Sequence, residues 1–192
     1  MRRRLDNGRR EELLDGVMLV AGAQGFQDLK VGDLARELHC SVATLYKLAP
    51  TKVDLVALAL ERWGESTLSE AESRSLERSS ASERARTYYR VGAERTRELS
   101  HEFRRDMERF SATRQTWRVI SDGFIERFAH LLDEAAEAGE IRPVNATFLA
   151  GMLRYVAIAV RDEDLLDRAG LTAREALLEV DTIIWEGVRR TS

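Results

Sequence analysis

One short stretch in the first quarter of the chain carries hydroxyl and ammonium groups at a spacing that suits one face of a short helix. Thr44 can bond a phosphate or a base edge, Tyr46 adds a hydroxyl and a ring, and Lys47 adds a positive charge. Ala43 is small enough for close approach to a base, and Lys52 would lie in the first turn of a following helix, whose free N–H groups attract phosphate. These groups are suited to contact phosphates and base edges.

A second pattern suggests a metal site. Glu126, His130 and Glu134 recur every four residues and would share one helix face, so a metal-dependent enzyme is an alternative, although surface charge pairing explains the same spacing. The chain has no phosphate-binding loop and no nucleophile elbow, and its single cysteine, Cys40, allows no intramolecular disulfide. We therefore expect no enzyme activity, no metal and no cofactor.

The elements that position these groups are expected to be helices. Apolar residues make up 44% of the 192 residues, and the chain has only two prolines. The apolar positions recur at the helical spacing of about 3.6 residues, and strand-like runs are absent. This pattern predicts an all-α fold of about nine helices. Because no apolar run approaches the roughly 20 residues of a membrane span and no apolar segment follows the N-terminal arginines, we expect no membrane contact, no signal peptide and a cytoplasmic location.

Charge is nearly balanced along the chain. The formal net charge is −3, and residues 1–52 hold nine Lys or Arg against seven Asp or Glu. A bulk polycation is therefore excluded, and any nucleic-acid contact must come from a few well-placed groups. An arginine-rich start suits either a solubilising tail or an arm that touches DNA; its members are Arg2, Arg3, Arg4, Arg9 and Arg10.

A helix-turn-helix is predicted by two short helices over residues 31–38 and 42–48. His39, in the turn between them, must reach a positive φ, which histidine tolerates better than most non-glycine residues. Val42 and Leu45 would pack back onto the first helix, which leaves the polar residues described above facing outward. The second helix would then be free to enter the major groove of DNA.

Helix ends are also marked in the sequence. Gly25 and Gly139 are expected to end the helices that precede them. Three N-terminal capping boxes are predicted, at Thr51–Asp54, Ser80–Glu83 and Thr172–Glu175.

Ten residues of this region match a known pattern at fixed spacing: Val31, Asp33, Leu34, Ala35, Ser41, Thr44, Leu45, Tyr46, Lys52 and Leu55. On these residues the stretch resembles the DNA-binding domain of TetR-family transcriptional regulators. The sequence departs from the family pattern at His39, Cys40, Ala43, Leu48, Ala49 and Val53. The resemblance implies a three-helix DNA-binding domain in residues 1–50, joined to a larger helical domain for ligand binding and dimerisation in residues 51–192.

The resemblance also implies a function. We expect a ligand-responsive regulator, a repressor that binds a pseudopalindromic operator as a homodimer and is released by a small molecule. The alternative is a helical small-molecule-binding or scaffold protein with a vestigial helix-turn-helix. The candidate DNA contacts are Lys30, Ser41, Ala43, Thr44, Tyr46, Lys47 and Lys52.

Two further sets of candidates lie in the C-terminal part. Clustered aromatic and sulfur-containing side chains would suit an apolar or aromatic effector. These are Trp63, Tyr88, Phe103, Met107, Phe110, Trp117, Phe124, Met152 and Tyr155. Apolar stripes on the last two long helices would form the dimer interface as a four-helix bundle. They contain Leu149, Leu153, Val156, Leu177, Ile184 and Val188.

Overall fold

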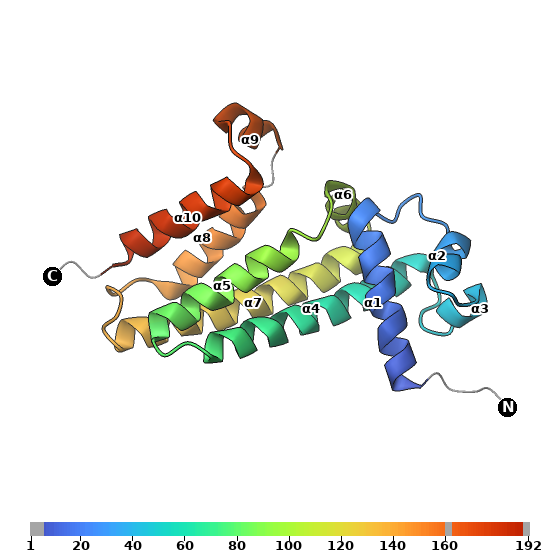
Figure 1. The fold of residues 1–192 in the computed structure, drawn as a ribbon, viewed down its shortest axis with the longest axis horizontal. Coiled ribbons are helices and arrows are strands. Elements are labelled where there is room, and N and C mark those ends of the chain that lie inside the picture. Colours follow the sequence, from blue (N-terminus) through green and yellow to red (C-terminus); the bar gives the residue numbers. More distant parts are fainter. Residues whose placement is uncertain (1–5, 160–162, 190–192) are drawn as a thin grey trace. The chain divides into compact units, whose positions relative to one another are not determined.

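A computed structural model describes residues 6–159 and 163–189, which form ten α-helices and no β-strand. The predicted all-α class is confirmed (Figure 1). The helices are α1 (Asn7–Gln24), α2 (Val31–Glu37), α3 (Val42–Leu45), α4 (Lys52–Leu76), α5 (Ala81–Thr96), α6 (His101–Arg109), α7 (Ser111–Glu137), α8 (Ala146–Ala159), α9 (Glu163–Ala169) and α10 (Ala173–Gly187). The short α9 is the helix beyond the nine expected. Arg2, Arg3 and Arg4 lie outside the described residues.

The chain divides into two compact units. The first comprises residues 1–70 and 94–122, and the second comprises residues 71–93 and 123–192. Helices α4, α5 and α7 contribute residues to both. A functional boundary near residue 50 remains a prediction, and it falls between α3 and the start of α4.

The core of the first unit is built around α1. Apolar side chains recur at helical spacing on one face of this helix and are buried; they are Leu14, Val17, Met18 and Ala21. The same core takes in buried side chains from α2, α3, α4 and α6, among them Leu34, Leu45, Leu60 and Phe103. The helix-turn-helix therefore shares one continuous apolar core with α4 and α6. Its packing does not depend on the few apolar residues of α2 and α3 alone.

Local signals fix the ends of several helices as the sequence predicts. Gly25 and Gly139 end α1 and α7 with φ of 79° and 71°. The capping box at the start of α10 is complete, because the Thr172 hydroxyl accepts the Glu175 N–H and the Glu175 carboxylate accepts the Thr172 N–H. At the start of α4 the Thr51 hydroxyl accepts the Asp54 N–H at 3.1 Å.

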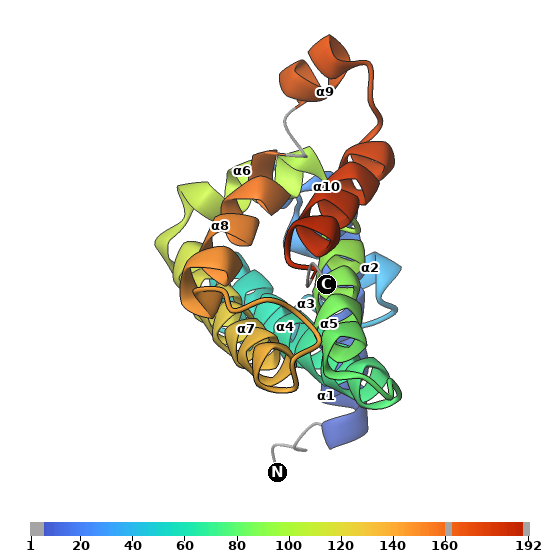
Figure 2. The same ribbon diagram turned by 90° about the vertical axis from the view of Figure 1, so that its left-hand side faces the viewer.

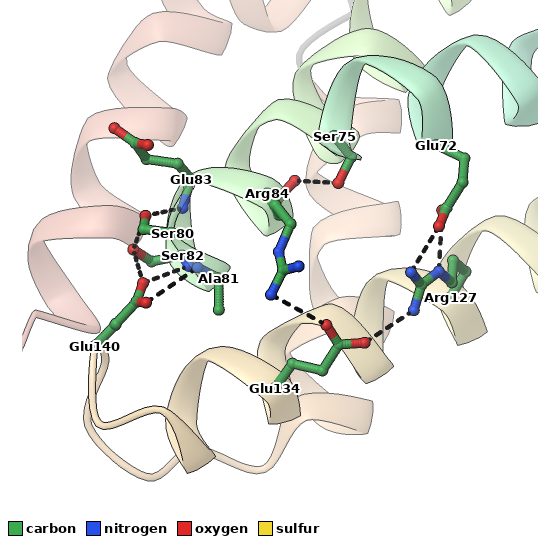
Figure 3. A network of polar contacts seen from close by, with 10 residues as sticks. All are labelled: Glu72, Ser75, Ser80, Ala81, Ser82, Glu83, Arg84, Arg127, Glu134 and Glu140. Atoms are coloured by element: carbon green, nitrogen blue, oxygen red, sulfur yellow. Dashed lines mark hydrogen bonds and ion pairs between the residues drawn. The ribbon is translucent and has the colours of Figure 1, made fainter. Parts of the chain in front are cut away.

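The start of α5 differs from the prediction. Ser80 accepts the N–H of Glu83 at 3.2 Å, which is the first half of the expected capping box. The carboxylate that completes the cap belongs to Glu140, which accepts the N–H groups of Ala81 at 3.1 Å and Ser82 at 2.8 Å (Figure 3). These bonds lower the pKa of Glu140, with the Ser82 N–H as the largest cause. A segment about 60 positions later in the chain thus caps this helix.

Ring contacts and polar bonds join α5, α7 and α10 in the second unit. Tyr88 and Phe124 stack with their centroids 4.6 Å apart. Arg86 on α5 makes a charge-assisted pair with the buried carboxylate of Asp181 on α10. The end of α10 returns to the segment after α7, where Arg142 donates its N–H to the Val188 carbonyl at 2.9 Å (Figure 2).

Candidate nucleic-acid interface

The turn between α2 and α3 has the geometry that the sequence predicts. His39 has φ of 48° and is the one non-glycine among the described residues with positive φ. The chain then closes with the Cys40 N–H bonded to the Ala35 carbonyl at 2.9 Å. Ala35 and Leu45 are buried where α2 and α3 meet. The two helices are therefore held together by a tight turn and by small and branched apolar side chains.

Arg9 on α1, one of the arginines near the start of the chain, makes a contact with α2 that was not predicted. Its guanidinium donates to the carbonyl of Leu38, at the end of α2, at 3.2 Å. A cation at a helix C-terminus satisfies carbonyls that have no partner within the helix. The guanidinium also lies near Cys40, whose thiol pKa is raised by burial, with Arg9 opposing that shift. Cys40 therefore stays protonated at neutral pH.

Helix α3 begins with a hydroxyl cap. Ser41 accepts the Thr44 N–H at 3.0 Å, and its hydroxyl lies 2.8 Å from that of Thr44. The helix is shorter than the predicted 42–48, because beyond Leu45 the chain continues in tighter turns that reach Leu48. Val42 was expected to point inward, and this prediction was wrong, because its side chain is 39% exposed in the first turn of α3.

Most of the candidate DNA contacts share an accessible surface around α3. The exposed members are Lys30, Ser41, Ala43, Tyr46 and Lys47, and Thr44 is half-buried. Lys52 differs, since its ammonium donates to the carbonyls of Gln27 at 2.7 Å and Leu29 at 3.0 Å. Two of its three donors are thus used within the protein, which gives Lys52 a role in holding the loop before α2.

Leu48 and Ala49, two of the departures from the family pattern, contribute to the core. Ala49 is buried and Leu48 packs against the core of the first unit. The turn that leads from α3 into α4 is therefore anchored by these two apolar side chains.

The nine candidate effector residues do not form one cluster. Phe103, Met107 and Phe110 belong to the core of the first unit, as do Trp63 and Trp117, whose ring centroids are 6.1 Å apart. In the second unit, Tyr88 and Phe124 stack on each other, while Met152 and Tyr155 on α8 are 40% and 66% exposed. Burial is the largest cause of the raised pKa of Tyr88.

A cleft of about 360 Å³ lies in the first unit, beside Trp63. It is lined by residues of α1, α4 and α5 and by the segment after α5, and its volume falls in the range of small-molecule sites. Arg95 lies over the Trp63 ring, with its guanidinium carbon 5.8 Å from the ring centroid. Trp63 is the one predicted effector residue that lines this cleft.

Of the three residues whose spacing could also suit a metal, Glu134 forms ion pairs. Glu134 binds Arg127 at 3.1 Å and Arg84 at 3.7 Å, and Arg127 also binds Glu72 at 2.7 Å (Figure 3). The bond from Arg127 lowers the pKa of Glu72. Glu126 and His130 are exposed, and the described residues contain no group of three or more His, Cys, Asp or Glu that could hold a metal.

Two of the six predicted dimer residues are buried within the chain itself. Leu153 and Val188 are 1% and 4% exposed, so they pack inside their own subunit. Three others have half-buried side chains: Leu149, Val156 and Ile184. The side chain of Leu177 is not among those that the structure describes. The apolar side chains that face outward are displaced from the predicted stripes; they are Phe148, Met152, Tyr155, Leu178 and Ile183.

No protein-family model and no curated protein matches the chain. Solved structures do. A protein from Saccharomonospora viridis, described as a transcriptional regulator and crystallised with choline, matches at 16% identity and TM-score 0.81, over 97% of this chain and 100% of its own. A Rhodococcus protein described as a TetR-family transcriptional regulator matches at 18% identity and TM-score 0.75, over 96% of this chain and 100% of its own.

A third solved structure is the TetR-family transcriptional regulator PfmR from Thermus thermophilus, at 18% identity and TM-score 0.64, over 93% of this chain and 99% of its own. Within the described residues, no helix combines the length and the apolar character needed to cross a bilayer. The helices of this chain thus follow, from end to end, the fold of TetR-family transcriptional regulators.

Proposed function

We propose that the chain is a ligand-responsive transcriptional regulator of the TetR type that acts in the cytoplasm and binds operator DNA through α2 and α3. The observation that carries the proposal is the surface around α3, where Ser41, Tyr46 and Lys47 are exposed on a helix-turn-helix whose core is continuous with α4 and α6. A short helix with such groups fits the major groove.

Each exposed group has a distinct part in the proposal. The Lys47 ammonium and the Tyr46 hydroxyl contact phosphates, which sets the register of the protein on the duplex. Thr44 and Ala43 lie closest to the base edges, where a hydroxyl bonds a base and a methyl group contacts thymine. Lys30, at the start of α2, adds a further phosphate contact.

The proposal is tested by fluorescence anisotropy with duplex DNA from upstream of the chain's own gene. Lys47→Ala is expected to weaken binding several-fold and to reduce the slope of log affinity against log salt by about 0.9, the amount expected for one lost phosphate contact. Arg78→Ala removes an equal charge from an exposed position in the second unit and should leave both quantities unchanged. No binding by the wild type would instead favour a scaffold with a vestigial helix-turn-helix.

We propose that the chain acts as a homodimer. The exposed apolar side chains Phe148, Met152 and Tyr155 lie on α8, and Leu178 and Ile183 lie on α10. Large apolar patches on a subunit mark a surface that is covered by a partner. A second copy is the favoured partner because two recognition helices must reach half-sites about 34–36 Å apart, or a multiple of that spacing.

We propose that a small molecule releases this repressor from its operator. Trp63 lines the cleft of about 360 Å³ in the first unit, and aromatic rings attract quaternary ammonium groups. The Saccharomonospora viridis protein was crystallised with choline, so choline is the first compound to add to a preformed complex with DNA. A fall in anisotropy that saturates with choline would identify it as an effector of this chain.

A further inference from the structure

The loop between α1 and α2 is held by a buried carboxylate from a distant part of the first unit. Asp106 on α6 is 2% exposed, and its Oδ2 accepts the backbone N–H groups of Phe26 and Gln27, both at 2.8 Å. The loop must pass very close to this oxygen. At Gly25, which has φ of 79°, a Cβ atom would lie 2.8 Å from Oδ2, so only glycine fits.

Two further contacts tie the same loop to α6. The Phe26 ring is fully buried between Phe103 and Phe110, with centroid distances of 5.6 and 5.4 Å. Arg109 donates to the Gln27 side-chain oxygen at 2.7 Å. The loop is therefore held by a carboxylate, by aromatic packing and by a guanidinium, all from α6 or the residue that follows it.

This loop leads directly into the helix-turn-helix. Lys30 is the residue directly before α2, three residues after Gln27. The Lys52 ammonium, from the start of α4, binds the carbonyls of Gln27 and Leu29 in the same loop. Asp106 thus binds two N–H groups of this loop and Lys52 binds two of its carbonyls, so the path of the chain into α2 is fixed at several points.

A buried carboxylate is not the simplest way to stabilise a core. The Asp106 Oδ1 accepts no hydrogen bond from the described residues and faces the Arg105 Nη2 at 3.7 Å. Burying such a charge has a desolvation cost that apolar packing avoids, and well-packed apolar residues often stabilise a core as well or better. The carboxylate fixes the orientation of two adjacent peptide groups through its two charge-assisted hydrogen bonds, which apolar packing cannot do.

We propose that Asp106 is a positioning residue for DNA binding. It touches no DNA, and it holds the loop over residues 25–30 so that α2 and α3 meet the duplex at a fixed orientation. The inference rests on the proposed function and adds to it a determinant of affinity that lies outside the helix-turn-helix.

The test compares Asp106→Ala, Asp106→Asn and the control Glu108→Ala, which removes an exposed carboxylate from the same helix. All are titrated with the upstream duplex at a temperature where circular dichroism shows full folding. Asp106→Ala is expected to weaken binding about tenfold, because two buried N–H groups lose their acceptor and the loop loses its fixed path. Asp106→Asn keeps one oxygen acceptor and should lose about threefold, since bonds to a neutral acceptor are weaker. Glu108→Ala should match the wild type.

Two readouts separate positioning from stability alone. The salt slope should stay at the wild-type value, because no phosphate contact is removed. Amide exchange at Phe26 and Gln27 should accelerate in Asp106→Ala, whereas a residue that contributed only to global stability would leave the affinity of the fully folded protein unchanged. If Asp106→Ala does not fold, the inference is tested by the expected threefold loss of DNA affinity in Asp106→Asn.

Wild-type affinity in every Asp106 variant that folds would overturn the inference and leave the proposed function intact. A wild-type protein that binds no duplex would overturn both.

Discussion

At the scale of single residues, the strongest sequence prediction concerned the turn of the helix-turn-helix. His39 stands where a backbone with positive φ is needed, and the structure has it there at 48°. This could be predicted because the requirement is local: only residues 38–41 connect α2 to α3, and so short a connection needs a tight turn. The role of Asp106 could not be predicted, because its partners Phe26 and Gln27 are about 80 positions away in the sequence.

The turn residue yields a prediction for stability. His39→Val should lower the free energy of unfolding by about 1–2 kcal/mol, because a β-branched side chain is strained at positive φ. His39→Gly should leave that free energy unchanged or raise it, since glycine adopts this conformation without a steric cost. Urea unfolding of the two variants measures both values. Equal destabilisation by valine and glycine would show that the histidine side chain, and not the backbone conformation, stabilises the turn.

At the scale of elements, the helical spacing of apolar residues predicted nine of the ten helices, because this periodicity depends only on near neighbours. What remained hidden was which apolar face each helix buries. Helix α8 has two such faces, with Leu149 and Leu153 on one and Phe148 and Met152 on the other, and the second is the exposed one. Periodicity alone cannot rank two faces that are both apolar, since the choice is made by the neighbouring helices.

The cap on α5 makes a prediction that depends on pH. Glu140→Ala should lower the free energy of unfolding by about 1 kcal/mol at neutral pH, the usual effect of losing an N-terminal cap. Because hydrogen bonds hold the folded-state pKa of Glu140 below the ordinary carboxyl value of 4.5, this contribution is present above that value and is lost as the pH falls through the lower folded one.

Thermal unfolding of the wild type and Glu140→Ala across the acid range measures this effect. The matched control is Glu61→Ala, at an exposed position of α4. A difference between wild type and Glu140→Ala that persists undiminished at low pH would contradict the account of the cap.

At the scale of the whole molecule, a motif of ten residues was enough to predict the fold that the solved structures share. The chain is less than 20% identical to each of the three compared proteins.

The predicted dimer is also a property of the whole molecule. Phe148→Glu should convert the proposed homodimer to a monomer, because it would place a charge in the proposed apolar interface. Sedimentation velocity measures the change.

Val119→Glu is the control for this variant, since Val119 is also exposed, at 68%, but lies on α7. It should leave the oligomeric state as it is in the wild type. A monomeric wild type, or a Phe148→Glu variant that remains a dimer, would refute the proposed interface.

The central claim is that two copies of the α3 surface bind one duplex, and hydroxyl-radical footprinting on the upstream DNA tests it most directly. We predict two protected, symmetry-related half-sites whose centres are separated by one helical turn of about 10–10.5 base pairs or a multiple of it, and the loss of both in Lys47→Ala. Uniform cleavage with the wild-type protein, or a single protected patch without a symmetric partner, would contradict the claim.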